Sequence, residues 1–349
     1  MEKNTMKNGH PRIKQAFKGL LITLGSLVLL FGLILLGSHV LTPVIYNDFF
    51  DGAAAEYETA GLDDALVPQG FAYLEDKNVY LQCGYMADES ASRIYIVDEQ
   101  NGYAARYVTL LSPDGTTYTG HTGDITSHND FVWLANDGEG EDNCVWVLSL
   151  TELLTTPNGG TITLKTKFQT ESRAACCLAD GEYLWVGEFY REEDYPTAKT
   201  HAFTVAGGVE HRALICAYPL DTAAEFGISG LTPELMLSVP GQVQGFAMTE
   251  GGGFVLSSSF GLSSSILRFY DGITLGQPDA ALDVNGTGVP VYFLDDDVLI
   301  RTVTAPPMSE EIVVRNDRLY VLFESACDKY IFGNFMRSRP VYSIPLEQE

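Results

Sequence analysis

The tetrapeptide Gln-Gly-Phe-Ala occurs twice in this chain, at residues 69–72 and 244–247. A Val-Pro pair lies shortly before each copy, and a strand-like run rich in Val follows it. Self-similarity of this kind indicates a repeat architecture, in which one small structural unit is copied along the chain. The recurrence therefore constrains the fold more than any other feature of the sequence, although it does not indicate a ligand.

Five units of similar layout follow residue 60, each made of short apolar runs separated by Gly, Asp, Asn, Ser and Pro, which is typical of an all-β protein. The first runs are 70–73, 124–127, 174–178, 245–248 and 311–314. The second runs are 79–83, 131–135, 183–187, 253–257 and 319–323, and the third runs are 93–97, 144–148, 213–218, 266–270 and 341–344. A fourth run follows in four units, at 105–110, 161–168, 234–239 and 298–303. Four strands per unit predict a β-propeller.

A small residue lies in or directly before the first run of four units, at Gly70, Gly123, Ala174 and Gly245. The innermost strands of a propeller converge on its axis, and glycine in a strand commonly marks such close approach of backbones. A β-sandwich would not need small residues at one fixed strand of every unit. This regularity favours the propeller over the sandwich.

The units predict five blades, with six as the alternative if residues 291–294 belong to an additional blade hidden within 269–304. The fifth unit ends at its third strand, because the chain stops at Glu349. A strand from residues 55–59 could complete it, which would close the ring and remove an open edge.

The Gln-Gly-Phe-Ala strands alternate with third strands such as Ser92-Arg93-Ile94-Tyr95. This alternation resembles the broad propeller group that includes gluconolactonases, strictosidine synthase-like proteins and NHL-repeat proteins. The resemblance covers most of the chain after residue 60, at the level of the repeat alone, and no catalytic motif of a family matches. It implies a fold and not an activity.

The N-terminal region differs in composition from the rest. Residues 1–18 contain five basic residues and one acid, and residues 19–41 contain no charged side chain. About 20 apolar residues span a bilayer, and basic residues before such a run place the N-terminus in the cytoplasm. The run is longer than a typical signal-peptide core. We therefore expect a cytoplasmic tail at 1–18, an uncleaved membrane anchor at 19–41, a tether at 42–55 and an extracytoplasmic propeller at 56–349.

The net charge of −25 argues against nucleic acid as a partner, since an acidic surface repels phosphates. The same charge suits divalent or cationic ligands, or only solubility. The spacing of the six cysteines matches no zinc motif. They lie mostly in apolar runs, which favours buried thiols over disulfides.

In a propeller, the start of each first strand and the end of each second strand open on one face. Ligands are expected on that face, above the central channel. Its polar residues form the predicted ligand site: Gln69, Asp124, Arg173, Glu188, Gln244, Glu310, Glu311 and Glu324. Convergent carboxylates and amides suit a small polar ligand, a glycan or a protein partner. A long loop, about residues 190–212, lies on the same face and is a candidate lid.

The clearest candidate cluster of acidic residues contains Glu310, Glu311 and Glu324. Oxygen-rich sites of this type suit calcium, so these three residues are the candidate metal ligands and calcium the candidate cofactor. Two of the carboxylates could instead provide acid and base for glycoside chemistry. The sequence thus predicts a binding module, with a calcium-assisted hydrolase of a lactone or glycoside as the alternative.

Overall fold

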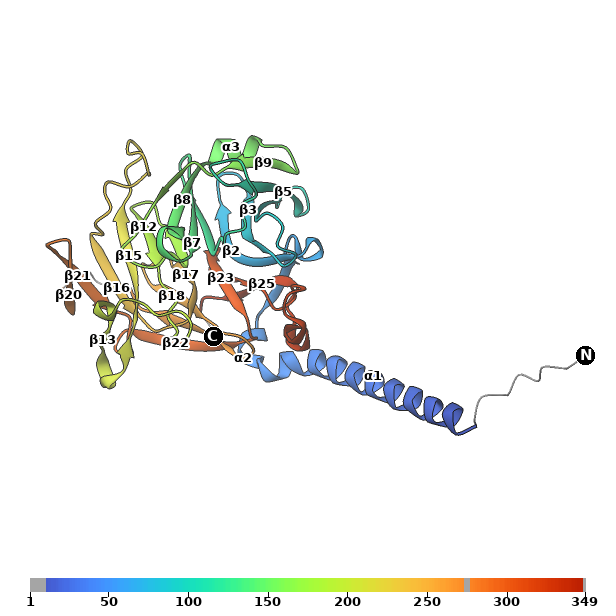
Figure 1. Cartoon of the computed structure of the whole chain (residues 1–349). Coiled ribbons are helices and arrows are strands. Elements are labelled where there is room, and N and C mark those ends of the chain that lie inside the picture. Colours follow the sequence, from blue (N-terminus) through green and yellow to red (C-terminus); the bar gives the residue numbers. More distant parts are fainter. Residues whose placement is uncertain (1–10, 273–276, 348–349) are drawn as a thin grey trace, which may run out of the picture.

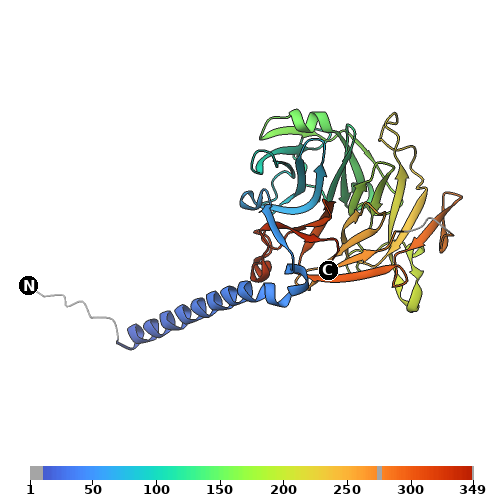
Figure 2. The same cartoon turned by 180° about the vertical axis from the view of Figure 1, so that it is seen from behind.

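The computed structural model describes residues 11–272 and 277–347, with side chains from residue 15 onward. A long N-terminal helix leads into a ring of five β-sheets, which the colours of Figure 1 follow in chain order around a central axis. The sheets are the five blades of a β-propeller, so the predicted fold is confirmed. Figure 2 shows from behind that the first and last segments of the propeller, blue and red, lie side by side.

Blades 1 and 2 each contain four antiparallel strands, numbered from the axis outward. Blade 1 consists of β2 (Leu66–Leu74), β3 (Val79–Met86), β4 (Arg93–Asp98) and β5 (Ala104–Leu111). Blade 2 consists of β6 (Asp124–His128), β7 (Phe131–Asp137), β8 (Asn143–Ser149) and β10 (Thr166–Phe168).

Blades 3 and 4 repeat the same order. Blade 3 consists of β11 (Cys176–Ala179), β12 (Tyr183–Gly187), β15 (Ala213–Pro219) and β16 (Leu235–Val239). Blade 4 consists of β17 (Val243–Met248), β18 (Phe254–Ser258), β19 (Ser265–Tyr270) and β22 (Leu299–Ala305). The innermost strands of neighbouring blades contact one another around the whole ring.

Blade 5 is completed by the N-terminal part of the propeller. Its three C-terminal strands are β23 (Ser309–Arg315), β24 (Arg318–Phe323) and β25 (Pro340–Pro345), and its outer strand is β1 (Ala54–Glu58). β1 pairs antiparallel to β25, with Ala54 opposite Ser343 and Glu58 opposite Pro340. The predicted closure of the ring by an N-terminal strand is therefore present, and it pairs the outer edge of β25.

Three further strands extend two of the blades. β9 (Gly160–Thr163) pairs parallel to β5 of blade 1, so the expected single run 161–168 is two strands that belong to different blades. A hairpin of β20 (Ala280–Val284) and β21 (Thr287–Phe293) extends blade 3, through parallel pairing with β16. Residues 291–293 thus belong to blade 3 and not to a sixth blade.

The remaining elements lie in connections. A short hairpin is formed by β13 (Phe203–Thr204) and β14 (Glu210–His211), and α3 spans Leu150–Thr155. Five 3-10 turns are present among the described residues: η1 (Leu62–Asp64), η2 (Gly140–Asp142), η3 (Lys199–His201), η4 (Ala206–Gly208) and η5 (Ile331–Met336).

The repeated glycines are explained by contacts between neighbouring blades. A Cβ atom on Gly70 would lie 2.5 Å from Asp124 Cα of blade 2, and one on Gly245 would lie 2.7 Å from Glu311 Cα of blade 5. Real Cβ atoms do not approach backbone so closely. Crowding of the inner strands therefore requires glycine at this position of the repeat, as the sequence predicts.

The apolar core lies between adjacent blades. Trp133, Tyr80, Tyr218 and Phe71 are among its largest fully buried side chains. All six cysteines are free and buried, so each is a small apolar core residue rather than half of a disulfide.

Helix α1 (Pro11–Ile45) includes a stretch, Gln15–Ile45, that is long and apolar enough to cross a membrane. It is followed by α2 (Asn47–Phe50), whose Phe49 is fully buried against Phe323 and Tyr342 of blade 5. Tyr46, between the two helices, is also buried. Residues 46–50, inside the expected tether, are therefore packed against the propeller.

Candidate functional site

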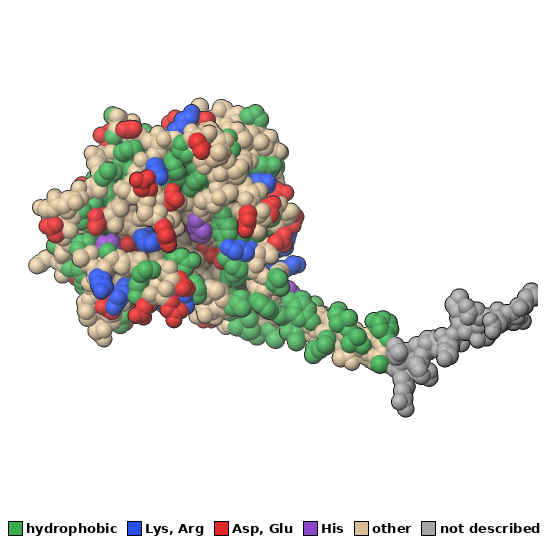
Figure 3. Space-filling view, viewed as in Figure 1, with side chains coloured by type: hydrophobic (Ala, Val, Ile, Leu, Met, Phe, Trp, Pro, Cys, Tyr) green, Lys and Arg blue, Asp and Glu red, His purple; other side chains and the backbone are tan. Residues whose placement is uncertain are grey.

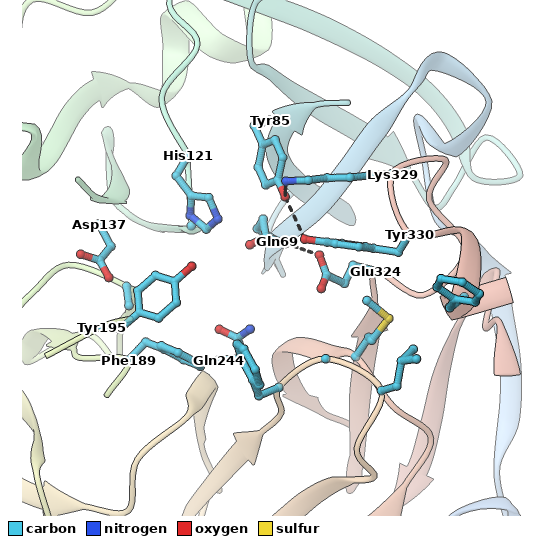
Figure 4. Close-up of a pocket in the computed structure, with 18 of the residues that line it drawn as sticks. Gln69, Tyr85, His121, Asp137, Phe189, Tyr195, Gln244, Glu324, Lys329 and Tyr330 are labelled. Carbon is cyan, nitrogen blue, oxygen red and sulfur yellow. Dashed lines mark hydrogen bonds between the residues drawn. The ribbon is translucent and has the colours of Figure 1, made fainter. Parts of the chain in front are cut away.

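A pocket of about 790 Å³ lies at the mouth of the central channel. Polar side chains from the starts of inner strands and the ends of second strands line it: Gln69, Tyr85, His121, Asp137, Gln244 and Glu324. Figure 4 shows these side chains pointing toward a common open space. The pocket is on the face that strand direction predicts.

The two glutamines of the repeat each contact an acid of blade 5. Gln69 Nε2 donates a hydrogen bond of 3.0 Å to Glu324 Oε2, and Gln244 Nε2 lies 3.5 Å from Glu310 Oε1. Gln69 Nε2 also donates to the carbonyl of Pro68, so its amide oxygen is left to face the pocket (Figure 4). The repeat thus places two equivalent amides on either side of one acidic pair.

Glu310 and Glu324 are buried, and their carboxyl groups are hydrogen-bonded to each other. Burial raises the pKa of Glu310 well above its ordinary value, and the neighbouring charge of Glu324 raises it further. Burial also raises the pKa of Glu324, to about 7, against the opposing effects of its bonds from Glu310 and Gln69 and of the Lys329 charge. Two buried carboxylates in contact cannot both ionise easily, so the pair retains a proton at neutral pH.

A second acidic pair, Asp124 and Glu311, lies deeper in the channel and is fully shielded from solvent. Asp124 accepts hydrogen bonds from the backbone N–H groups of Ile125 at 2.6 Å and of Cys177, in blade 3, at 2.6 Å. Glu311 Oε1 accepts hydrogen bonds of 2.9 Å from Phe246, in blade 4, and from Ile312. This pair therefore connects inner strands of several blades at the axis.

Glu311 Oε2 has no donor, although it is buried. Burial and the adjacent Asp124 charge raise the pKa of Glu311 well above its ordinary value, and burial raises the pKa of Asp124 to about 7. A proton on Glu311 Oε2, donated to Asp124, satisfies both observations. We therefore describe Glu311 as the acid and Asp124 as the carboxylate of this pair.

A basic and aromatic cluster lies beside Gln69 and Glu324 (Figure 4). Lys329 Nζ donates a hydrogen bond of 2.6 Å to Tyr85 Oη, and the hydroxyls of Tyr85 and Tyr330 are 3.2 Å apart. His121 stacks on the Tyr85 ring at a centroid distance of 5.1 Å. Its ring is exposed to the pocket, and desolvation by nearby protein atoms lowers its pKa, as does the Lys329 charge. His121 is thus a neutral imidazole at pH 7.

Apolar side chains form the remaining wall. Phe189 and Tyr195 pack edge to face at 5.1 Å, and Phe260 lies beside Phe189. Leu262, Met308, Ile331 and Phe332 complete the rim. The pocket therefore combines a polar floor with aromatic and aliphatic sides, as is common in small-molecule sites.

Two predicted site residues support the face without lining the pocket. Arg173 forms an ion pair with Asp137, which does line it. Glu188 is buried and lies 3.0 Å from His201 Nδ1, and it also accepts from the backbone of Leu214. His201 belongs to the long loop at 190–212, so Glu188 holds this loop on the propeller.

The predicted metal ligands do not meet at one point. Glu310 contacts Glu324 at the pocket floor, whereas Glu311 contacts Asp124 in the channel. Among the described side chains, no group of three or more His, Cys, Asp or Glu has the geometry to hold a metal ion.

The aromatic wall and the Lys329 cluster were not predicted. Lys329, Tyr330 and η5 belong to the long connection between β24 and β25, and Phe260 and Leu262 to the connection between β18 and β19. The apolar residues in these connections, Ile331-Phe332 and Phe260-Gly-Leu262, could have indicated this wall from the sequence. Exposed apolar residues in loops on the site face indicate a binding wall.

No family model and no curated protein matches the chain. Among solved structures, it is similar to PQQ-bound aldose sugar dehydrogenase from Streptomyces coelicolor, with 10% identity over 83% of this chain and 95% of that chain and a TM-score of 0.46. It is also similar to exo-β-1,3-galactanase from Phanerochaete chrysosporium, with 11% identity over 83% and 63% and a TM-score of 0.46. A putative glucose dehydrogenase from Thermus thermophilus has 12% identity over 83% and 98% and a TM-score of 0.41. At these values the likeness gives no information on function.

Proposed function

We propose that this chain is a membrane-anchored binding module whose pocket takes a small, hydroxyl-rich ligand of the carbohydrate class. The observation that carries the proposal is the convergence of Gln69, Gln244 and Glu324 on one pocket of about 790 Å³. Apolar helix α1 supports the anchor, and the basic residues that precede it in the sequence favour a propeller outside the cytoplasm.

The chemistry of the walls supports hydroxyl recognition. Amides and a neutral imidazole both donate and accept hydrogen bonds, and a hydroxyl group needs partners of both kinds. The acidic pair at the floor retains a proton, which lowers its negative charge. Phe189, Tyr195 and Phe260 provide flat apolar surfaces on which the carbon-bound hydrogens of a sugar ring can pack.

Binding to a panel of free sugars tests this proposal. Full-length protein in nanodiscs is titrated by calorimetry with glucose, galactose, mannose, N-acetylglucosamine and maltose. We expect at least one member to bind, and we expect Glu324→Gln and Gln69→Leu to weaken that binding by roughly tenfold or more, as loss of a hydrogen bond to a charged group does. The matched control is Glu250→Gln, an exposed acid in the turn between β17 and β18 at the opposite face. Absence of binding by every sugar, or equal binding by all variants, contradicts the proposal.

A hydrolase acting on a lactone or glycoside is the second candidate, because Glu324 has a pKa of about 7 at the pocket floor. General acids and bases work best when their pKa lies near the operating pH. The Glu310 and Glu324 carboxyls are hydrogen-bonded, which brings them closer together than the roughly 5–9.5 Å between the two catalytic carboxylates of glycosidases. They would therefore act together as one acid–base group, not as a separate acid and nucleophile or base.

Turnover of glucono-δ-lactone and p-nitrophenyl glycosides, with and without added calcium, tests this candidate. A rate that depends on Glu324 and changes with pH near 7 supports a hydrolase. Sugar binding with no turnover in either condition leaves the binding module as the function.

A further inference from the structure

We infer that η5 and its apolar side chains insert into the outer half of the lipid bilayer, so that one side of the pocket rim lies at the membrane. The inference concerns how the propeller sits on its membrane and does not depend on which ligand the pocket takes. It rests on the contacts of η5 with helix α1, on the exposure of its side chains and on the distribution of charge along the chain.

The middle of the apolar run contacts η5 directly. The rings of Phe31 in α1 and Phe335 in η5 pack edge to face with centroids 5.7 Å apart. Further along the helix, Leu35 is half-buried and Thr42 is buried, so this part of α1 lies against the propeller. Tyr46 Oη lies 3.6 Å from the sulfur of Met336, which follows Phe335 and is the last residue of η5. The contact therefore follows the helix from Phe31 to Tyr46.

The depth of Phe31 follows from helix geometry. The apolar run covers residues 19–41, which at 1.5 Å per residue is about 34 Å and matches a hydrocarbon core of roughly 30 Å. Phe31 is ten residues before Leu41 and so lies about 15 Å along the helix from that end. A centred span thus places Phe31, and the ring of Phe335 beside it, well inside the hydrocarbon.

Sliding the span toward the N-terminus would be costly. A span that kept Phe335 in water would have to begin near residue 11, which would bring Arg12, Lys14 and Lys18 into the bilayer. A charged side chain inside the hydrocarbon core is strongly unfavourable, and less so where it can reach the interface. The centred span avoids this cost.

The side chains of η5 are suited to lipid. Ile331 is 70% exposed and Phe332 is 64% exposed, which is unusual for such residues in water. Transfer of this exposed apolar surface from water into lipid is favourable, because the hydrophobic effect grows with the apolar area removed from water. Figure 3 shows apolar surface continuing from α1 onto the adjoining edge of the propeller.

Charged residues flank η5 on both sides. Lys329, at the N-terminal end, is bonded to Tyr85 within the pocket, whereas Arg337, at the C-terminal end, is exposed, and a long basic side chain of this kind can reach toward lipid head groups. Asp328, also exposed, is the one acid beside them, which would have to remain in the aqueous layer. Since Ile331 and Phe332 also line the pocket, membrane insertion of η5 places this side of the rim in the outer leaflet.

Depth-dependent fluorescence quenching tests the inference. Full-length Phe332→Trp is reconstituted into vesicles of dioleoyl phosphatidylcholine, with or without phosphatidylcholine brominated on its acyl chains. Trp133, Trp146 and Trp185 are buried in the propeller, so the unsubstituted chain gives the background. We expect the added tryptophan to lose emission in brominated lipid. Ile331→Trp provides a second reporter if Phe332→Trp does not fold.

Two further variants make the result decisive. Leu231→Trp, at a 49% exposed residue in the connection between β15 and β16, is the aqueous control and should not be quenched. Leu24→Trp, inside α1, reports whether the helix spans the bilayer. If Leu24→Trp is quenched but Phe332→Trp is quenched no more than Leu231→Trp, the inference is overturned and the membrane anchor stands. Lack of quenching at all three positions overturns both the insertion of η5 and the membrane anchor. Sugar binding is measured in a separate experiment, so its outcome is independent of these results.

Discussion

The side-chain amide of Gln69 donates a hydrogen bond of 3.0 Å to Glu324, an acid 255 residues further along the chain. Gln244, the same residue in the second copy of the repeat, lies 3.5 Å from Glu310. The two acids are in turn hydrogen-bonded to each other. The glutamine of the repeat is not needed for packing of the inner strand. In both copies it contacts one member of an acidic pair at the mouth of the propeller.

The deeper pair, Asp124 and Glu311, is expected to respond unequally to neutral substitutions. In Glu311→Gln, the new NH₂ group replaces the donor-less Oε2 and donates to Asp124, so the variant should fold with little loss of stability. In the native protein each Asp124 carboxylate oxygen accepts a hydrogen bond from a backbone N–H, one from Ile125 and one from Cys177. In Asp124→Asn one of these oxygens becomes an NH₂ group, which cannot accept, so one backbone N–H loses its partner. Each unsatisfied buried group costs about 1–3 kcal/mol. Thermal unfolding of both variants at pH 7 measures the difference, and equal losses would contradict the assigned proton.

The same pair gives a dependence of stability on pH. The folded-state pKa of Asp124, about 7, and that of Glu311 are raised above their ordinary values of 3.8 and 4.5. Between those values and about pH 7 the folded state binds more protons than the unfolded state, so stability falls as pH rises. The slope is about 1.4 kcal/mol per pH unit for each retained proton.

Unfolding midpoints between pH 4.5 and 8 measure this slope. Glu311→Gln removes one ionisable group and gives Asp124 a permanent donor, so its profile should be flatter than that of the unsubstituted protein. Parallel profiles would show that the axial pair does not retain a proton. Glu250→Gln, at an exposed position, should leave the profile unchanged.

The repeated glycines should not tolerate even a methyl group. Gly70→Ala and Gly245→Ala would each place Cβ 2.5–2.7 Å from the backbone of the adjacent blade. Overpacking of this kind costs about 1–3 kcal/mol, which lowers the unfolding midpoint. Gly230→Ala, where no heavy atom lies within 4 Å, is the matched control and should be nearly neutral. Equal midpoints for all three variants would contradict crowding at the axis.

Closure of the ring by β1 should contribute strongly to stability. Tyr57 in β1 stacks on Tyr103 at 4.6 Å, and its hydroxyl accepts a hydrogen bond of 3.2 Å from buried Gln82. Tyr57→Phe removes only the hydrogen bond and should cost about 1 kcal/mol. Tyr57→Ala also leaves a cavity between blades and should cost about 3–5 kcal/mol. Chemical denaturation separates the two, and an Ala variant as stable as the Phe variant would show that β1 adds little.

Much of the fold could be predicted from local sequence. Each blade is a series of short apolar runs with turn residues between them, and the small residues of the first run reveal the axis. The closing strand at Ala54–Glu58 follows from a missing strand in the last blade. The hairpin of β20 and β21 was harder to assign, because its pairing with β16 joins segments distant in sequence.

The site was predicted as a face, but not as an arrangement of side chains. Glu310 and Glu311 are adjacent in sequence yet contact different acids, since neighbouring residues of a strand point to opposite sides. Strand alternation could have separated them. The positions of Lys329 and Tyr330 could not have been derived, because the path of the connection between β24 and β25 depends on helix α1 and on blade 1.

We propose that the pocket between Gln69, Gln244 and Glu324 binds a hydroxyl-rich ligand. Calorimetric titration of the full-length protein with the sugar panel, repeated with Glu324→Gln and with Glu250→Gln, tests it most directly. We expect binding that Glu324→Gln weakens by roughly tenfold or more and that Glu250→Gln leaves unchanged. Binding that is insensitive to Glu324, or no binding by any sugar, would contradict it.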